Sequence, residues 1–162
     1  MFKIIGSLMI GGACLYVGLK RSMQLKTRYR SLCDFQNSLE LLSTEIAFRE
    51  TELKRAFINT GNILLNEAAK RIETDGIKSA LTLAVKKCSV SLCLTDGDKD
   101  TILMLKERIG MTDVEHQIKN IEGVRNILDL HIKAAKYDMD KLCRLYSGGG
   151  ILTGIFLVLV FI

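Results

Sequence analysis

Residues 112–142 read TDVEHQIKNIEGVRNILDLHIKAAKYDMDKL, and this stretch decides the fold class. It opens with Thr112 and Glu115, the spacing of a capping box in which each side chain satisfies a backbone N–H of the first helical turn. Apolar residues then recur with a mean step of 3.5, the period of one helix face. They are Val114, Ile118, Ile121, Val124, Leu128, Ile132, Ala135, Met139 and Leu142. The stretch therefore predicts one long amphipathic helix.

Further helical segments precede it. A second apolar face predicts another long helix and consists of Leu32, Phe35, Leu39, Leu42 and Ile46. Between the two, apolar spacing predicts a short helix that begins after an N-cap at Thr51 and ends at Gly61. It also predicts short helices over 64–72, 77–88 and 102–109, with turns at 75–76 and 95–98. Proline is absent, and no alternating apolar and polar run indicates a strand. We expect an all-α fold, an antiparallel bundle of about six helices whose first and last members lie side by side.

Both ends of the chain are uncharged. No charged side chain occurs in 4–19 or in 145–162, and helices of this length cross roughly 27–28 Å, about the thickness of a bilayer core. We therefore predict transmembrane helices at 1–19 and 145–162, flanking a helical domain at 20–144. A cleaved signal peptide, or a lipoprotein modified at Cys14, is the alternative for the first segment, although the cations after Leu19 favour an anchor.

Small residues share one face of each predicted span. Their spacing of three and four lets another helix approach closely, as membrane helices do when they associate. In the first span they are Ser7, Gly11, Cys14 and Gly18, and in the second they are Gly150 and Gly154. These positions are candidates for helix–helix packing within the bilayer.

Cations border both spans on their inner sides. The membrane-proximal basic residues are Lys20, Arg21, Lys26, Arg28 and Arg30 after the first span and Lys141 and Arg144 before the second. Because cytoplasmic loops carry the excess of Lys and Arg, the middle domain is expected in the cytoplasm with both termini on the outer side. The same cations suit anionic lipid headgroups.

No arrangement of residues indicates catalysis. The sequence has no phosphate-binding glycine loop, serine elbow or zinc-binding histidine pair, and residues 96–98 lack the later ligands of a calcium loop. Five irregularly spaced cysteines favour neither a metal site nor a disulfide framework. His116 and His131 are expected at the surface or boundary of a helix. We expect no cofactor, no metal, no small-molecule substrate and, because acids dilute the basic residues, no nucleic acid.

What remains is surface for protein partners. Glu45 and Arg49, four residues apart, have the spacing of a helical ion pair, and Gln117 lies one step from the apolar face of its helix. Each is a candidate for packing or for partner contact.

Several motifs in order resemble one family. The run LELLSTEIAF at 39–48, followed by TEL at 51–53, resembles a leucine-rich helix with a Glu-Ile-x-aromatic motif and a Thr-Pro-Leu turn. The run IGMTD at 109–113, which ends at Asp113, together with Glu115 and Gln117 is similar to a Leu-Gly-x-x-Asp…Gln segment, and glycines with an apolar tail follow Tyr146. These are features of the stage III sporulation protein AB family of endospore-forming bacteria. Glu52 departs from the pattern, because the family has proline there.

The resemblance covers both ends and implies a function. It implies a non-catalytic membrane platform of the channel-like secretion apparatus between mother cell and forespore, in the mother-cell membrane around the forespore. Its helical domain is expected to be similar to the cytoplasmic domains of the type II secretion inner-membrane platform protein. The implied partners are a secretion-type ATPase, the AA protein of the same operon, and other channel subunits. The alternatives are a pore-forming, holin-like protein and a membrane-anchored ligand sensor.

Overall fold

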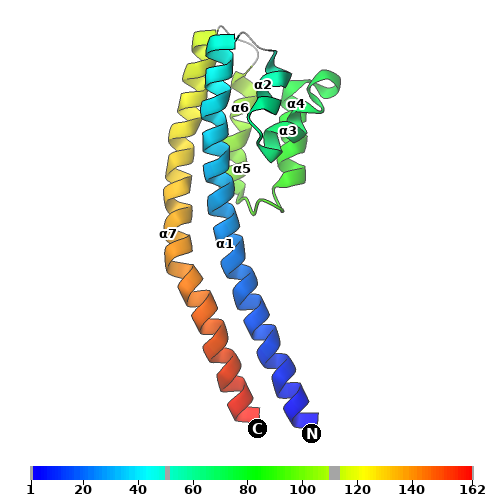
Figure 1. The fold of residues 1–162 in the computed structure, drawn as a ribbon, viewed down its shortest axis with the longest axis vertical. Coiled ribbons are helices and arrows are strands. Elements are labelled where there is room, and N and C mark those ends of the chain that lie inside the picture. Colours follow the sequence, from blue (N-terminus) through cyan, green and yellow to red (C-terminus); the bar gives the residue numbers. More distant parts are fainter. Residues whose placement is uncertain (1, 50–51, 110–113, 162) are drawn as a thin grey trace. The chain divides into compact units, whose positions relative to one another are not determined.

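The computed structural model describes residues 2–49, 52–109 and 114–161, and these residues form helices without any strand (Figure 1). The predicted all-α class is therefore confirmed for the part of the chain that is described. In order, the helices are α1 (Phe2–Arg49), α2 (Leu53–Asn59), α3 (Ile63–Ala69), α4 (Ile72–Cys88), α5 (Asp96–Leu103), α6 (Leu105–Arg108) and α7 (Val114–Phe161).

Two long helices, α1 and α7, carry the chain ends, and each has 48 residues. Neither contains proline, so nothing in the sequence removes a backbone hydrogen bond within them. The predicted continuity is thus confirmed: each amphipathic segment continues without interruption into the apolar segment beside it.

The chain divides into two compact units. Unit 1 comprises Met1–Tyr29 and Ala134–Ile162, the outer parts of α1 and α7. Contacts between the helices within it include the thiol of Cys143, which lies 3.3 Å from the carbonyl oxygen of Ser22, and the guanidinium of Arg28, which lies 3.5 Å from the carboxylate of Asp138. From Ser22 to Arg28 the residue numbers of α1 rise, while those of their partners on α7 fall from Cys143 to Asp138. The two helices therefore run antiparallel, with both termini at one end of the unit (Figure 1).

Unit 2, Arg30–Lys133, has a core from several helices. The predicted apolar face of α1 is buried, from Leu32 and Leu39 at 0% exposure to Ile46 at 7%. Within unit 2 the predicted face of α7 is buried at Ile121, Val124, Leu128 and Ile132, whereas Val114 at its start is 41% exposed. The guanidinium of Arg125 on α7 donates to the carboxylate of Glu40 on α1 at 3.1 Å, so the first and last helices do lie side by side in this unit.

The short helices differ from the predicted ones at their ends. Helix α3 ends at Ala69, and Ile72 instead begins α4. The predicted break at 75–76 is present within α4 as a kink at Gly76, whose φ of 72° and ψ of 162° suit glycine alone. Gly61, with φ of 68°, follows α2 as predicted.

The predicted turn at 95–98 was wrong. Asp96 to Asp98 form the first turn of α5, because Thr95 and Asp98 build a capping box: the Thr95 hydroxyl accepts from the Asp98 N–H, and the Asp98 carboxylate accepts from the Thr95 N–H at 2.9 Å. Thr51 and Thr112, the two predicted caps, lie outside the described residues, and the N-cap of α2 is Glu52.

Among the residues that the structure describes, no helix combines the length and the apolar character that a bilayer crossing requires. Both predicted spans, 1–19 and 145–162, consist mostly of residues whose side chains fall outside the described set. The membrane-spanning assignment therefore stays a prediction from sequence.

Candidate functional site

A groove opens in the surface of unit 2 and encloses about 370 Å³. One wall is α1, the second is the α2–α3 turn with the start of α3, and the third is the segment that leads into α5. The volume of the groove lies within the usual range of roughly 300–1,000 Å³ for binding pockets, and the chemistry of its lining resembles that of helix-binding grooves.

The floor of the groove is apolar and its rim is partly so. Phe35, Leu64 and Ile102 are buried beneath it, whereas Leu41 is 51% exposed and Ile63 is 65% exposed at its edge. Large apolar side chains exposed together around a hollow are typical of a binding surface. The groove therefore offers an apolar partner segment both a floor and two flanking side chains.

Charge in the groove has one sign. Asp34 supplies the one charged side chain among the described residues that line it, and Ser31, Asn37 and Ser38 are polar and neutral. The Ser38 hydroxyl donates to the backbone carbonyl of Asp34 at 2.6 Å. The exposed carboxylate is thus available to a cation from outside.

The second wall is held by local hydrogen bonds. The Thr60 hydroxyl donates to the carbonyl of Phe57 at 2.7 Å, and the Asn62 side chain accepts from the N–H groups of Leu64 and Leu65 as the N-cap of α3. Gly61 makes the turn between these two residues in the left-handed region. The turn therefore presents Ile63 from a fixed backbone.

A second cluster joins α7 to α5 within unit 2. His131 Nδ1 lies 2.7 Å from Asp98 Oδ1, and its Nε2 lies 3.4 Å from the Thr101 hydroxyl. Asp98 has no exposed surface, whereas His131 is 26% exposed on its side chain, at the boundary as predicted. Because the Thr101 hydroxyl donates to the carbonyl of Gly97 at 2.9 Å, it is engaged in holding the helix and is not poised as a nucleophile. The pair therefore acts as a structural link between two helices.

The described cysteines Cys33, Cys88, Cys93 and Cys143 form no disulfide. Burial raises the pKa of the Cys88 thiol, which keeps it protonated and unreactive at neutral pH. Within the described part of the chain, no group of three or more His, Cys, Asp or Glu side chains is placed to hold a metal ion.

The predicted small-residue face is only partly covered by the description. Gly18 is buried, and so is Ser22, the next position at the same spacing, which meets Cys143 on α7. Ser22 therefore contacts the other end of the same chain at this level. The side chains of Ser7 and Cys14, together with Gly11, Gly150 and Gly154, lie outside the described set.

The predicted basic residues divide into two kinds. Arg28 is directed inward, at 13% side-chain exposure, to its ion pair with Asp138. The others are exposed on their helices: Lys20, Arg21, Lys26, Arg30, Lys141 and Arg144. Arg30 belongs to unit 2 and the rest to unit 1.

Two of the predicted partner residues, Glu45 and Gln117, have described side chains. Glu45 accepts from the amide of Asn59 on α2 at 3.2 Å, which is a packing role. Gln117 is half-buried on α7. The side chain of Arg49 and the whole of Asp113 lie outside the described residues, so the Glu45–Arg49 pair stays a prediction.

Comparison with known proteins gives a family and a fold. Residues 3–162 match the sequence model of the family described as stage III sporulation protein AB. A solved structure described as stage III sporulation protein AB matches with a TM-score of 0.64 and 20% identity, over 70% of this chain and 96% of that chain. No curated protein matches the chain.

Proposed function

The chain belongs to the stage III sporulation protein AB family and so has a role in sporulation, and from this premise we propose that it is a non-catalytic membrane platform. In this proposal both ends anchor it in the mother-cell membrane around the forespore, and unit 2 docks a secretion-type ATPase, the AA protein of the same operon, on the cytoplasmic side. Other channel subunits would contact the membrane part. The observation that carries the proposal is the open, apolar, singly charged groove of unit 2.

The placement in the membrane rests on the ends of the chain. Residues 4–19 and 145–162 carry no charge, and a helix in lipid satisfies all of its own backbone hydrogen bonds. Both termini lie at the same end of unit 1, which supports two spans that enter the bilayer from one side (Figure 1). The cations that follow Leu19 and precede Leu145 support a cytoplasmic position for unit 2.

The residues that line the groove indicate what kind of partner segment it binds. Its apolar floor and the exposed Leu41 and Ile63 suit the apolar face of an amphipathic helix. Among the described residues that line the groove Asp34 alone is charged, so the docking helix should bring a Lys or Arg to that position. We propose that the occupant is such a helix of the ATPase.

Co-purification of the full chain with the ATPase tests this assignment. Ile63→Asp places a charge where the apolar face of the docking helix would lie and should weaken binding by about tenfold or more, because burying an unpaired charge against an apolar surface is costly. Its matched control is Ile58→Asp, since Ile58 is also exposed, at 49%, but does not line the groove. Residue 63 begins α3, where an added acid suits the helix dipole, so the variant is expected to fold.

A charge-reversal pair tests the electrostatic part. Asp34→Lys should weaken binding, and reversing one Lys or Arg on the ATPase should restore it. Asp100→Lys, on the exposed face of α5, is the matched control and should bind normally. Equal loss in groove and control variants, at unchanged helicity by circular dichroism, would show that the groove is not the docking site.

A further inference from the structure

We infer that the cations of unit 1 form a binding site for anionic phospholipid headgroups, so that the protein selects acidic lipids around its two helices. This inference rests on the proposed membrane placement and adds the lipid partner. The surface in question is named the basic ring and consists of Lys20 and Arg21 on α1 with Lys141 and Arg144 on α7.

The antiparallel register brings the four cations to one level. Cys143 meets Ser22, and both belong to the same pair of helices. Lys20 and Arg21 lie within two residues before Ser22, and Lys141 and Arg144 lie within two residues of Cys143. Residues far apart in the sequence thus form the basic ring around the helix pair of unit 1.

The same register aligns the apolar segments. On α1 the uncharged segment ends at Leu19, directly before Lys20, and on α7 it begins at Leu145, directly after Arg144. Both therefore start from the basic ring and continue toward the termini, which lie together at one end of unit 1 (Figure 1). A belt of cations at the point where two apolar helices begin is the expected level of lipid headgroups.

Few acidic residues of unit 1 offset the positive charge of the basic ring. Residues 1–29 contain no Asp or Glu, and residues 134–162 contain only Asp138 and Asp140. Asp138 is the partner of Arg28, which is not part of the ring. All four ring cations are exposed, and a shallow hollow of about 280 Å³ beside two of them is lined by Val17, Lys20, Arg21 and Gln24. The hollow gives a phosphate group room between an apolar residue and two cations.

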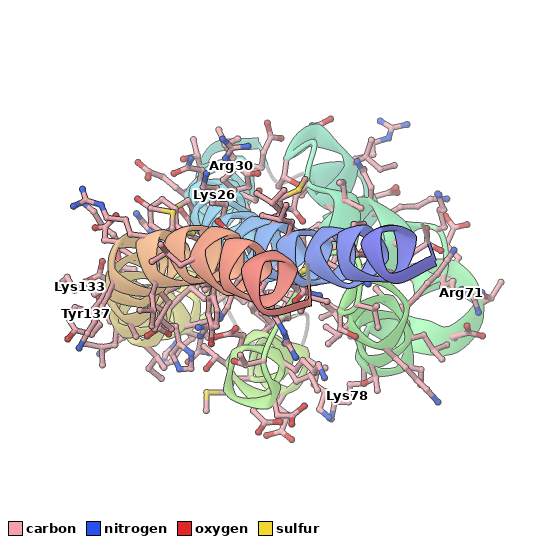
Figure 2. All side chains as sticks on the ribbon, turned by 90° about the horizontal axis from the view of Figure 1, so that it is seen from below. Lys26, Arg30, Arg71, Lys78, Lys133 and Tyr137 are labelled. Atoms are coloured by element: carbon pink, nitrogen blue, oxygen red, sulfur yellow. The ribbon has the colours of Figure 1, made fainter. Side chains whose placement is uncertain are left out.

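Tyrosines accompany the ring. Tyr16 is 66% exposed one turn before Lys20, and Tyr146 is 40% exposed two residues after Arg144. Tyr137 is 62% exposed, and the ammonium of Lys141 lies 5.4 Å from the centre of its ring. In Figure 2 the labelled Tyr137 lies at the outer edge of α7. Exposed tyrosine beside cations is typical of the membrane–water interface, which favours lipid over a folded acidic protein as the partner.

Quenching by brominated lipids tests the inference on the full chain. The protein contains no tryptophan, so Tyr16→Trp places a single fluorescent reporter one turn from the basic ring. The reporter protein is reconstituted into phosphatidylcholine vesicles and into equal mixtures of phosphatidylcholine and phosphatidylglycerol, with either lipid brominated. We expect stronger quenching by brominated phosphatidylglycerol than by brominated phosphatidylcholine, with a preference that weakens as salt is added.

Charge removal identifies the residues responsible. Lys20→Gln with Arg21→Gln should reduce the preference by about fivefold per cation, the usual contribution of one cation near an anionic surface. The matched control is Lys78→Gln with Lys86→Gln, which removes two exposed cations from α4 of unit 2 and should keep the preference. Circular dichroism verifies that each variant remains helical.

The outcomes separate this inference from the proposed function. Equal quenching by the two lipids, or an equal loss in the ring and control variants, would overturn lipid selection and leave the membrane placement standing. No quenching by either brominated lipid would show that residue 16 is not in the bilayer, which would overturn the membrane placement itself.

Discussion

His131 Nδ1 lies 2.7 Å from Oδ1 of Asp98, and this contact ties the long helix α7 to the first turn of α5. Asp98 is fully buried and also accepts from the Thr95 N–H, so its carboxylate serves the capping box and the histidine together. Asp98→Ala should therefore lower the free energy of unfolding by about 1–3 kcal/mol, the cost of leaving buried partners unsatisfied. Thermal or urea unfolding of the full chain in detergent, followed by circular dichroism, measures the change.

A control variant and a double variant test the contact between Asp98 and His131 further. Asp100→Ala, exposed on the same helix, should alter stability by less than about 0.5 kcal/mol. His131→Ala combined with Asp98→Ala should cost less than the two single changes added together, because both remove the same contact. Strictly additive losses would refute a direct link between the two side chains.

Two glycines should respond in opposite directions to the same substitution. Gly76 has φ of 72° and ψ of 162°, a region open only to glycine, so Gly76→Ala should destabilise by about 1–3 kcal/mol. Gly123 is within α7, and an added Cβ would meet nothing within 4 Å, so Gly123→Ala should stabilise by up to about 1 kcal/mol. Melting temperatures of the two variants check this, and a shift of the same sign in both would count against the described backbone.

Acid should remove one ionic contribution between α3 and α4. Hydrogen bonds from Lys87, which has the larger effect, and from Lys70 to the Glu67 carboxylate hold the pKa of Glu67 below its ordinary value. A lowered pKa stabilises the folded state above the unfolded-state pKa, and this contribution is lost as pH falls through the folded-state value. Glu67→Gln should therefore be less stable than the natural chain at neutral pH, with a difference that shrinks on acidification. A difference that is the same at neutral and acidic pH would exclude this ion pair as the cause.

The helical faces could be predicted from sequence because their information is local. Leu32, Leu39 and Leu42 recur at the helix period, and all three are fully buried. Gly61 and Gly76 also marked breaks correctly, because a positive φ needs glycine wherever the rest of the chain goes. Thr95 was missed as a cap although its spacing to Asp98 was visible, because Asp-Gly-Asp is also typical of a turn.

The groove and the basic ring could not be predicted in the same way. Asp34, Ile63 and Ile102 are far apart in the sequence and share a surface only after α1, α3 and α5 have packed. The link from His131 to Asp98 spans 33 residues and has no local pattern. Each cation of the basic ring was recognised, but their common level follows from the Ser22–Cys143 contact between helix ends that are 121 residues apart.

Labelling of single cysteines in intact cells tests the central claim most directly. In a full-length chain whose native cysteines are replaced by serine, one reporter is Phe2→Cys and the other is Asp100→Cys, at an exposed position of α5. Two membrane spans around a cytoplasmic domain predict that a membrane-impermeant thiol reagent labels residue 2 in intact cells and residue 100 only after the cells are permeabilised. Labelling of residue 100 in intact cells, or protection of both positions, would contradict it.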